Sequence, residues 1–141
     1  MTRIYWDTML FVYWFEGVPG YAPRVGEIRA SMGHRGDELL TSTFTLGELL
    51  VKPFERGAEE SAAAIRTALS PPWVRQIPFT SDVAEHYARI RSRNRVTPAD
   101  AIHLASAASA GTNLFLTNDR ALTRLAIPGI DFIAPLDVNL F

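Results

Sequence analysis

Short β-rich runs alternate with helical segments along almost the whole chain, and no other feature of the sequence restricts the fold as strongly. Strands are predicted at residues 3–7, 39–43, 73–79, 113–117 and 131–134. Helices are predicted at residues 8–15, 22–32, 45–52, 57–69, 81–94 and 98–110, with a further short helix from Asp119. Strands that alternate with helices indicate an α/β fold, a three-layer α/β/α sandwich with a central, mostly parallel sheet.

Size and composition agree with a single soluble globular domain over residues 1–141. Hydrophobic residues make up 48% of the chain and charged residues 21%, which is too apolar for a disordered chain. The apolar run at residues 9–15 is far shorter than the roughly 20 residues of a membrane-spanning helix, so no membrane association is expected. The lack of cysteine excludes disulfides and thiolate metal sites and is compatible with the cytoplasm, where we expect the protein. A net charge of −1 argues against binding nucleic acid by bulk attraction.

Four acidic residues fall at strand ends and helix starts. Asp7 follows the first predicted strand, and Asp119 follows the strand at 113–117. Glu48 and Asp100 fall in the first turns of predicted helices. Ligands of open α/β sheets bind in the crevice outside the carboxyl ends of the strands. The four carboxylates are therefore predicted to lie on the side of the sheet where ligands bind.

Two of these acids also have a local explanation as residues of helix starts. Thr45 and Glu48 match the S/T-x-x-E capping box, in which the Glu48 side chain bonds back to the start of the helix. Because Glu48 also follows an apolar strand, an orientation into the crevice stays open. Thr97 and Pro98 begin a helix with Asp100 at its third position, where an acid is favoured with or without a ligand.

The other two acids differ in how well local structure explains them. Asn118 is a candidate N-cap before Asp119, where the helix dipole alone favours an acid. Asp7 has the weakest local explanation, because an unpaired acid at the end of a core strand is costly to bury. Four acids at one edge repel one another unless a cation holds them, and all-oxygen ligation suits Mg²⁺ or Mn²⁺. Such a site activates water and neutralises a phosphate, which indicates phosphodiester hydrolysis.

Four segments, taken in order, resemble one known family. They are "IYWDT", "TSTFTLGELL", "ADAIHLASA" and "LFLTNDRAL", and together they resemble the PIN domain, particularly the VapC-type toxins of bacterial toxin–antitoxin pairs. The resemblance implies a Mg²⁺- or Mn²⁺-dependent endoribonuclease whose catalytic and metal-binding residues are Asp7, Glu48, Asp100 and Asp119, supported by Thr8, Thr117 and Asn118. It further implies that a metal-bound water attacks a phosphodiester of tRNA, rRNA or mRNA, which inhibits translation and growth. A VapB-type antitoxin partner and a homodimer are also implied.

The chain departs from this family at one position. Members commonly have Asn or Ser two residues after the first Asp, where this chain has Met9. A polar group that would orient Asp7 or a metal-bound water is then missing, which lowers the expected metal affinity or activity. The alternative function is therefore a catalytically weakened PIN-like domain that binds RNA or protein. Because all four acids are retained, the active nuclease is the favoured prediction.

Three further features have both a structural and a functional interpretation. His103, three residues after Asp100, is predicted to be a packed or hydrogen-bonded helix residue rather than a metal ligand. A basic cluster forms either an RNA-phosphate patch or a solvated helix face, and comprises Arg89, Arg91, Arg93 and Arg95. An aromatic cluster belongs either to the core or, as the resemblance implies, to a groove for an antitoxin segment, and comprises Phe11, Tyr13, Trp14 and Phe15.

Overall fold

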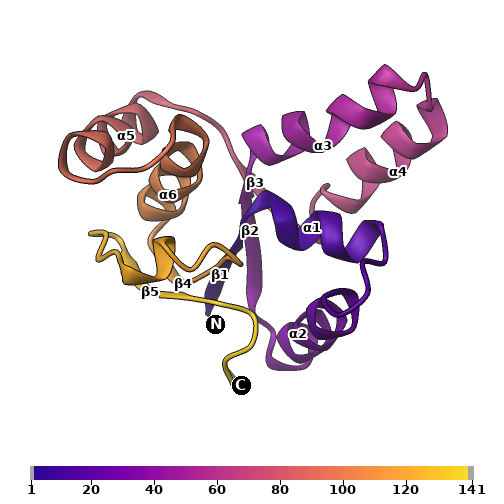
Figure 1. Cartoon of the computed structure of the whole chain (residues 1–141), viewed down its shortest axis with the longest axis horizontal. Coiled ribbons are helices and arrows are strands. Elements are labelled where there is room, and N and C mark those ends of the chain that lie inside the picture. Colours follow the sequence, from indigo (N-terminus) through magenta and orange to yellow (C-terminus); the bar gives the residue numbers. More distant parts are fainter. Residues whose placement is uncertain (1, 140–141) are drawn as a thin grey trace.

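A five-stranded parallel sheet forms the centre of the molecule, with helices on both of its faces (Figure 1). The computed structural model describes residues 2–139. The strands are β1 (Arg3–Trp6), β2 (Glu38–Ser42), β3 (Arg75–Ile77), β4 (Thr112–Leu116) and β5 (Ile130–Ala134). The helices are α1 (Thr8–Phe15), α2 (Ala22–Arg35), α3 (Thr43–Glu55), α4 (Glu59–Ala68), α5 (Ser81–Arg93), α6 (Pro98–Ala110) and the 3₁₀ helix η1 (Leu122–Arg124). The strand order is β3-β2-β1-β4-β5 and every pair is parallel, which confirms the predicted α/β/α sandwich.

Each face of the sheet carries its own hydrophobic core, because successive strand residues point to opposite faces. Ile4 and Trp6 of β1 belong to the core that includes residues of α1 and α2, whereas Tyr5 belongs to the core with α5 and α6. The neighbouring strands repeat this alternation, with Leu39 and Leu116 in the first core and Leu40 and Phe115 in the second. In Figure 1, α1 to α4 accordingly lie on one side of the sheet and α5 and α6 on the other.

Helix α6 packs with the sheet through mainly small residues. Ala101, Ala105 and Ala108 are among its buried residues, which allow a helix to lie close to a strand. The helix begins at Pro98, as predicted, and the Thr97 hydroxyl caps it by accepting a hydrogen bond from the backbone N–H of Asp100 at 3.1 Å. The cap therefore uses the backbone of Asp100 and not its carboxylate. None of the helices in residues 2–139, α6 included, has the length and hydrophobicity needed to cross a membrane.

Helix α3 begins earlier than the sequence predicted. The Ser42 hydroxyl caps it by accepting a hydrogen bond from a backbone N–H two residues later, at 3.0 Å. Thr45 is instead buried inside the first turn, with its hydroxyl 2.7 Å from the hydroxyl of Thr41. The capping-box interpretation of Glu48 is therefore wrong, because Glu48 lies in the second turn of the helix.

Other element boundaries also differ from the prediction. Helix α3 continues past Pro53 to Glu55 instead of ending before the proline. Helix α2 extends to Arg35, three residues beyond the predicted end. The short helix expected from Asp119 is absent, and the chain instead forms η1 three residues later. The reason is local, because the Asp119 carboxylate accepts a hydrogen bond from the N–H of Ala121 at 3.0 Å and forms a turn.

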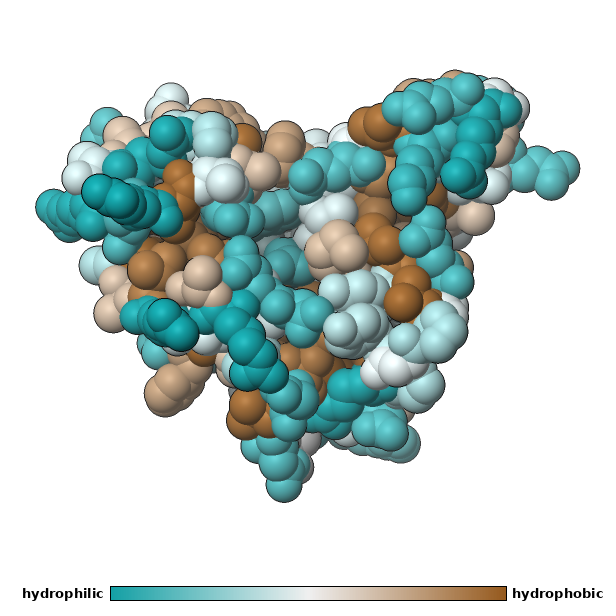
Figure 2. All heavy atoms as spheres, in the orientation of Figure 1, coloured by the Kyte–Doolittle hydropathy of each residue, from teal (hydrophilic) through white to brown (hydrophobic). Residues whose placement is uncertain are grey.

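The sheet has a topological switch point between β1 and β4. The strands that follow β1 lie first on one side of it, as β2 and β3, and then on the other side, as β4 and β5. Crevices that bind ligands form at such points, outside the carboxyl ends of the strands. The backbone N–H of Asp7 donates to the carbonyl of Leu116 at 3.3 Å and joins the ends of β1 and β4 there. Figure 2 shows the surface hollowed between the lobe of α3 and α4 and the lobe of α5 and α6.

Candidate active site

Asp7 lies half-buried at the switch point, between the end of β1 and the start of α1. Its Oδ2 accepts a hydrogen bond from the Thr117 hydroxyl at 2.5 Å, and its Oδ1 accepts one from the backbone N–H of Met9 at 3.1 Å. Burial raises the pKa of Asp7 above its ordinary value of 3.8, and the charge of Asp100 raises it further. The Thr117 bond, the nearby His103 and the Met9 N–H act in the opposite direction. A positive charge beside Asp7 would therefore favour its ionised form.

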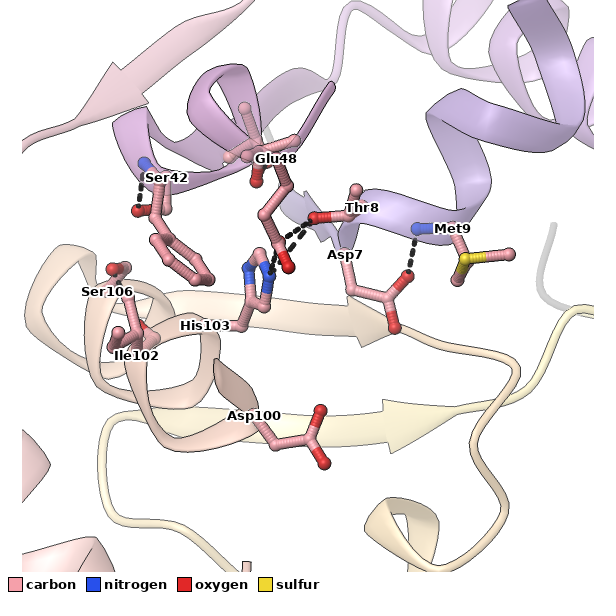
Figure 3. A network of polar contacts seen from close by, with 12 residues as sticks. Asp7, Thr8, Met9, Ser42, Glu48, Asp100, Ile102, His103 and Ser106 are labelled. Carbon is pink, nitrogen blue, oxygen red and sulfur yellow. Dashed lines mark hydrogen bonds and ion pairs between the residues drawn. The ribbon is translucent and has the colours of Figure 1, made fainter. Parts of the chain in front are cut away.

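Asp100 projects from the first turn of α6 toward the side of the site on which Asp7 lies (Figure 3). Its carboxylate forms no hydrogen bond or ion pair with any residue in 2–139. The two carboxylates nevertheless lie close enough for the charge of Asp100 to raise the pKa of Asp7. A cation bound between them would relieve this repulsion.

Glu48 is held by partners from two other helices (Figure 3). Its Oε1 accepts a hydrogen bond from the Thr8 hydroxyl of α1 and lies 3.0 Å from Nε2 of His103 on α6. The same Nε2 lies 3.1 Å from Oγ1 of Thr8, and Nδ1 of His103 lies 2.7 Å from the Tyr5 hydroxyl. The Glu48 side chain is 33% exposed, whereas that of His103 is 6% exposed. Glu48 is thus an accessible acid with a buried partner.

The partners of Glu48 favour its ionised form. Burial acts to raise the pKa of Glu48, but the hydrogen bonds from His103 and Thr8, together with the charge of His103, outweigh burial and lower the pKa. Burial also raises the pKa of Tyr5 far above its ordinary value of 10.0, so the Tyr5 hydroxyl stays protonated beside His103. At neutral pH Glu48 is therefore a carboxylate that only accepts hydrogen bonds.

Asp119 is exposed, and the loop that carries it is anchored through its neighbours. Its backbone N–H donates to the hydroxyl of Thr117 at 3.1 Å, while its carboxylate accepts the hydrogen bond of the local turn. Thr117 is fully buried and links this loop to β1. The side-chain amide of Asn118 points elsewhere and donates to the hydroxyl of Tyr13 at 3.0 Å. Thr117 therefore contacts two of the predicted acids, whereas Asn118 anchors the loop to α1.

The four acids lie around one edge of the sheet without forming a complete set of metal ligands. Among residues 2–139, no three Asp, Glu or His side chains are close enough together to hold one metal ion. Asp7 and Asp100 form the interacting pair. Mg²⁺ is commonly bound by one or two carboxylates and keeps several waters, so this oxygen-only pair fits Mg²⁺ or Mn²⁺. A metal site that uses all four carboxylates stays a prediction.

Met9 lies at the rim of the site, beside Asp7 (Figure 3). The residue is 44% exposed, and its backbone N–H donates to the Asp7 carboxylate that caps α1. The departure from the family pattern therefore removes a polar side chain but leaves the backbone contact in place.

The predicted basic cluster is exposed, and its members differ in their contacts. Arg89 pairs with a glutamate one turn earlier at 3.5 Å, and Arg91 donates to the Tyr87 hydroxyl at 2.9 Å. The side chains of Arg93 and Arg95 have no hydrogen bond or ion pair with any other described residue. A role of the cluster in RNA binding stays a prediction.

The aromatic residues of α1 are divided between the core and the surface. Phe11 and Tyr13 are buried in the core. Trp14 and Phe15 are each 39% exposed, and Phe15 lines a groove of about 590 Å³ formed by α1, α3 and α4. Most of the groove surface is apolar, and Glu48 is also part of its lining. Hydrophobic residues are visible in this region of Figure 2.

A family model of the PIN domain matches residues 4–128 of the chain. The chain belongs to the PIN domain family. The family prediction from the four sequence segments is thereby confirmed. No curated protein sequence matches this PIN domain.

Solved structures from toxin–antitoxin systems share the fold of this PIN domain. The DNA-bound VapBC from Salmonella typhimurium aligns with a TM-score of 0.75 and 22% identity over 96% of this chain and 99% of that chain. VapBC2 from Rickettsia felis, bound to a DNA fragment from its promoter, aligns with a TM-score of 0.71 and 16% identity over 95% and 98% of the two chains. VapC20 from Mycobacterium tuberculosis, a sarcin–ricin loop cleaving toxin, aligns with a TM-score of 0.67 and 18% identity over 87% and 96%. At these identities the likeness shows a shared fold.

The sequence predicted that His103 is packed or hydrogen-bonded, but it did not predict which residues His103 contacts. The prediction of a packed or hydrogen-bonded helix residue is confirmed by its contacts with Tyr5 and Glu48. Its spacing of three residues from Asp100 places the two side chains on one side of α6, which is the available sequence signal. Glu48 lies 55 positions earlier in the chain, so the contact depends on how α3 and α6 are placed on the sheet.

Proposed function

We propose that this PIN domain is a divalent-metal-dependent endoribonuclease and the toxin of a VapBC-type pair. The observation that carries the proposal is the position of Asp7 and Asp100, whose carboxylates face the same side of the site beside the β1/β4 switch point (Figure 3). The carboxylate of Asp100 has no hydrogen-bond or ion-pair partner in residues 2–139. Two neighbouring acids whose negative charges repel each other are an arrangement that suits a cation.

Asp7 and Asp100 would hold Mg²⁺ or Mn²⁺ through oxygen atoms alone. When bound, such an ion supplies Lewis acidity that neutralises charge on the phosphodiester and makes water a better nucleophile. Glu48 accepts its two bonds through Oε1, so its Oε2 would be available both to contact the ion and to accept a hydrogen bond from the attacking water. Asp119, exposed at the rim, would contact a further water or the ion. Because water is the nucleophile, no covalent enzyme intermediate is expected.

The proposed substrate is RNA, as tRNA, rRNA or mRNA. Arg93, at the end of α5, and Arg95, in the short loop before α6, are exposed, and α6 carries Asp100. Arginines in this position suit the phosphates of a strand that reaches the acids. One protein of similar fold, VapC20 from Mycobacterium tuberculosis, is a sarcin–ricin loop cleaving toxin, which supports a cleavage activity.

The proposed partner is a VapB-type antitoxin. Two of the proteins with a similar fold are VapBC complexes, and the groove between α1, α3 and α4 is the proposed contact surface. Its apolar lining is flanked by charged residues, namely Glu16, Lys52 and Arg56. Because Glu48 also lines this groove, an antitoxin bound there would restrict access to the acid. A homodimer stays a prediction.

The decisive experiment is RNA cleavage by the purified protein with Mg²⁺ or Mn²⁺, compared with Asp7→Asn and Asp100→Asn. We expect both variants to lose cleavage. Asp100→Asn should also keep its melting temperature within about 2 °C, because the helix cap uses the backbone N–H of that residue. Equal cleavage by the three proteins would contradict the assignment of these acids. An Asp100→Asn variant that loses stability but keeps activity would indicate a structural role alone.

A second candidate function is a PIN-like module that binds RNA or protein without cleavage. The exposed apolar side chain of Met9 favours it, because a polar group beside Asp7 is missing. Failure to cleave any tested RNA, together with failure to bind Mn²⁺ in calorimetry, would support this module over the nuclease.

A further inference from the structure

We propose that His103 is a positioning residue that fixes the orientation of the Glu48 carboxylate, with one oxygen held and the other left free for the reaction. The proposal rests on the proposed nuclease function and assigns a role in that function to a buried residue outside the set of acids. It stands on the contacts of His103, Glu48 and Thr8 and on the burial of the ring.

The His103 ring has little freedom to move. The residue is 5% exposed, and each ring nitrogen lies within hydrogen-bond distance of a partner. The rings of Tyr5 and Phe44 contact it edge-on, with centroids at 5.9 Å and 5.6 Å. A ring confined in this way holds its nitrogens in constant positions.

The pattern of donors requires a hydrogen on Nε2 of His103. The Thr8 hydroxyl donates its single hydrogen to Oε1 of Glu48, so its oxygen can only accept from Nε2 at 3.1 Å. An ionised Glu48 also only accepts, at 3.0 Å from the same nitrogen. Nε2–H is therefore shared between the two oxygens and holds Thr8 and Glu48 together.

This arrangement makes the two oxygens of Glu48 different. Oε1 accepts from Thr8 and from His103, whereas Oε2 accepts no hydrogen bond from any residue in 2–139. A glutamate at 33% exposure would otherwise sample several rotamers. Holding one oxygen leaves the other in a defined place, which is how residues behind a metal or water ligand raise affinity and activity.

The anchor of His103 extends into the body of the sheet. Tyr5, which contacts Nδ1 at 2.7 Å, is fully buried on β1. Beside Tyr5, the Thr41 hydroxyl of β2 donates to the carbonyl of Trp6 on β1 at 2.9 Å and lies 2.7 Å from the Thr45 hydroxyl. The position of Glu48 is thereby coupled to β1 and β2, the strands that carry the site.

Two substitutions of His103 separate positioning from packing. The amide nitrogen of Gln reaches about as far from the backbone as Nε2, whereas the amide of Asn reaches only as far as Nδ1, where its oxygen can accept from the Tyr5 hydroxyl. His103→Gln should therefore keep a donor for Glu48, and His103→Asn should keep only the contact with Tyr5. Mn²⁺ affinity measured by calorimetry and melting temperature are recorded for both variants, in the wild-type background and in Glu48→Gln.

We expect His103→Asn to weaken Mn²⁺ binding by about 10- to 100-fold, as is usual for residues behind metal ligands. His103→Gln should recover most of the affinity at a similar melting temperature. In the Glu48→Gln background, His103→Asn should weaken binding little further, because both changes remove the same interaction.

An unchanged Mn²⁺ affinity in His103→Asn, or an equal loss in both backgrounds, would overturn this inference while the nuclease proposal stands. Should His103→Asn fail to fold, Tyr5→Phe replaces it, since it removes the partner of Nδ1 without touching Glu48. An unchanged affinity in a folded Tyr5→Phe protein then overturns the inference. A wild-type protein that binds no Mn²⁺ would overturn the proposed function and this inference together.

Discussion

Thr117→Val should destabilise the protein in a pH-dependent way, because it removes the hydroxyl that Asp7 depends on. Valine has nearly the shape of threonine, so it fills the same fully buried space. The lost bond is the 2.5 Å contact from the Thr117 hydroxyl to Oδ2 of Asp7. The N–H of Asp119 also loses its acceptor, but this residue is exposed and water can replace the hydroxyl. The loss therefore concerns mainly Asp7.

A hydrogen bond to a charged group contributes about 1.5–3 kcal/mol to the free energy of unfolding. Because the half-buried Asp7 can form a replacement bond with water in the variant, we expect the free energy of unfolding to fall by about 1–2 kcal/mol at neutral pH. For a domain of this size the loss corresponds to a decrease of about 3–8 °C in Tm. Thr117→Ser is the matched control, because it keeps the hydroxyl and removes one buried methyl group, worth about 1 kcal/mol at any pH.

The sign of the pH dependence follows from the pKa of Asp7, which burial already raises in the folded protein and which the Thr117 bond lowers. Removing that bond raises the folded pKa further, so the folded variant binds more protons than the folded wild type between the two folded pKa values. Stability of the variant therefore falls relative to the wild type as pH rises through this interval, and the difference stays constant above it. At lower pH, where Asp7 is neutral in every state, the difference is smallest.

The assay is urea unfolding followed by tryptophan fluorescence at several values between pH 4 and pH 8 for the wild type and both Thr117 variants. We expect the deficit of the Val variant to grow with pH and that of the Ser variant to stay constant. A Val deficit that is independent of pH, or that grows toward acid, would refute this account of the bond between Thr117 and Asp7.

Two further predictions concern the rim of the site and the basic cluster. Met9→Asn places a polar group beside Asp7 and keeps the backbone cap, so Mn²⁺ binding measured by calorimetry should tighten by up to about tenfold. Met9→Leu is the apolar control. Equal Mn²⁺ affinity of the two variants would contradict a role for this position. The double variant Arg93→Ala and Arg95→Ala should weaken RNA binding and reduce the slope of log K against log salt by about 1.4–1.8, with an unchanged Tm. Arg29→Ala, beside the start of β2, is the control, and a similar loss in it would indicate general charge attraction.

The order of the secondary-structure elements was predictable because it depends on local patterns. Apolar strand runs and helix-start residues act over a few positions, and the cap of Thr97 on α6 follows such a pattern. Boundaries failed where tertiary contacts compete with a local pattern. Thr45 matches a helix cap, yet it lies buried in the first turn of α3, where its hydroxyl pairs with that of Thr41 on β2, and Ser42 caps the helix instead.

The candidate site was predictable in part for the same reason. Asp7 was placed correctly at a strand end, because parallel strands bring their carboxyl ends to one edge and the acid directly follows β1. The free carboxylate of Asp100 agrees with the interpretation that Thr97 caps the helix through the backbone. The ligand set of the four acids stays a prediction that the proposed metal-binding experiments test.

The amino-acid sequence therefore suffices for the family, the layered α/β architecture and the edge of the sheet where the acids gather, because each of these follows from patterns that are local or repeat along the chain. The distinct environments of the acids depend on the folded molecule. Thr117 meets Asp7 across 110 positions, and His103 meets Glu48 across 55. The first contact depends on the pairing of β1 with β4, and the second on how α3 and α6 pack on the sheet. Both join residues whose separation along the chain carries no signal of their proximity.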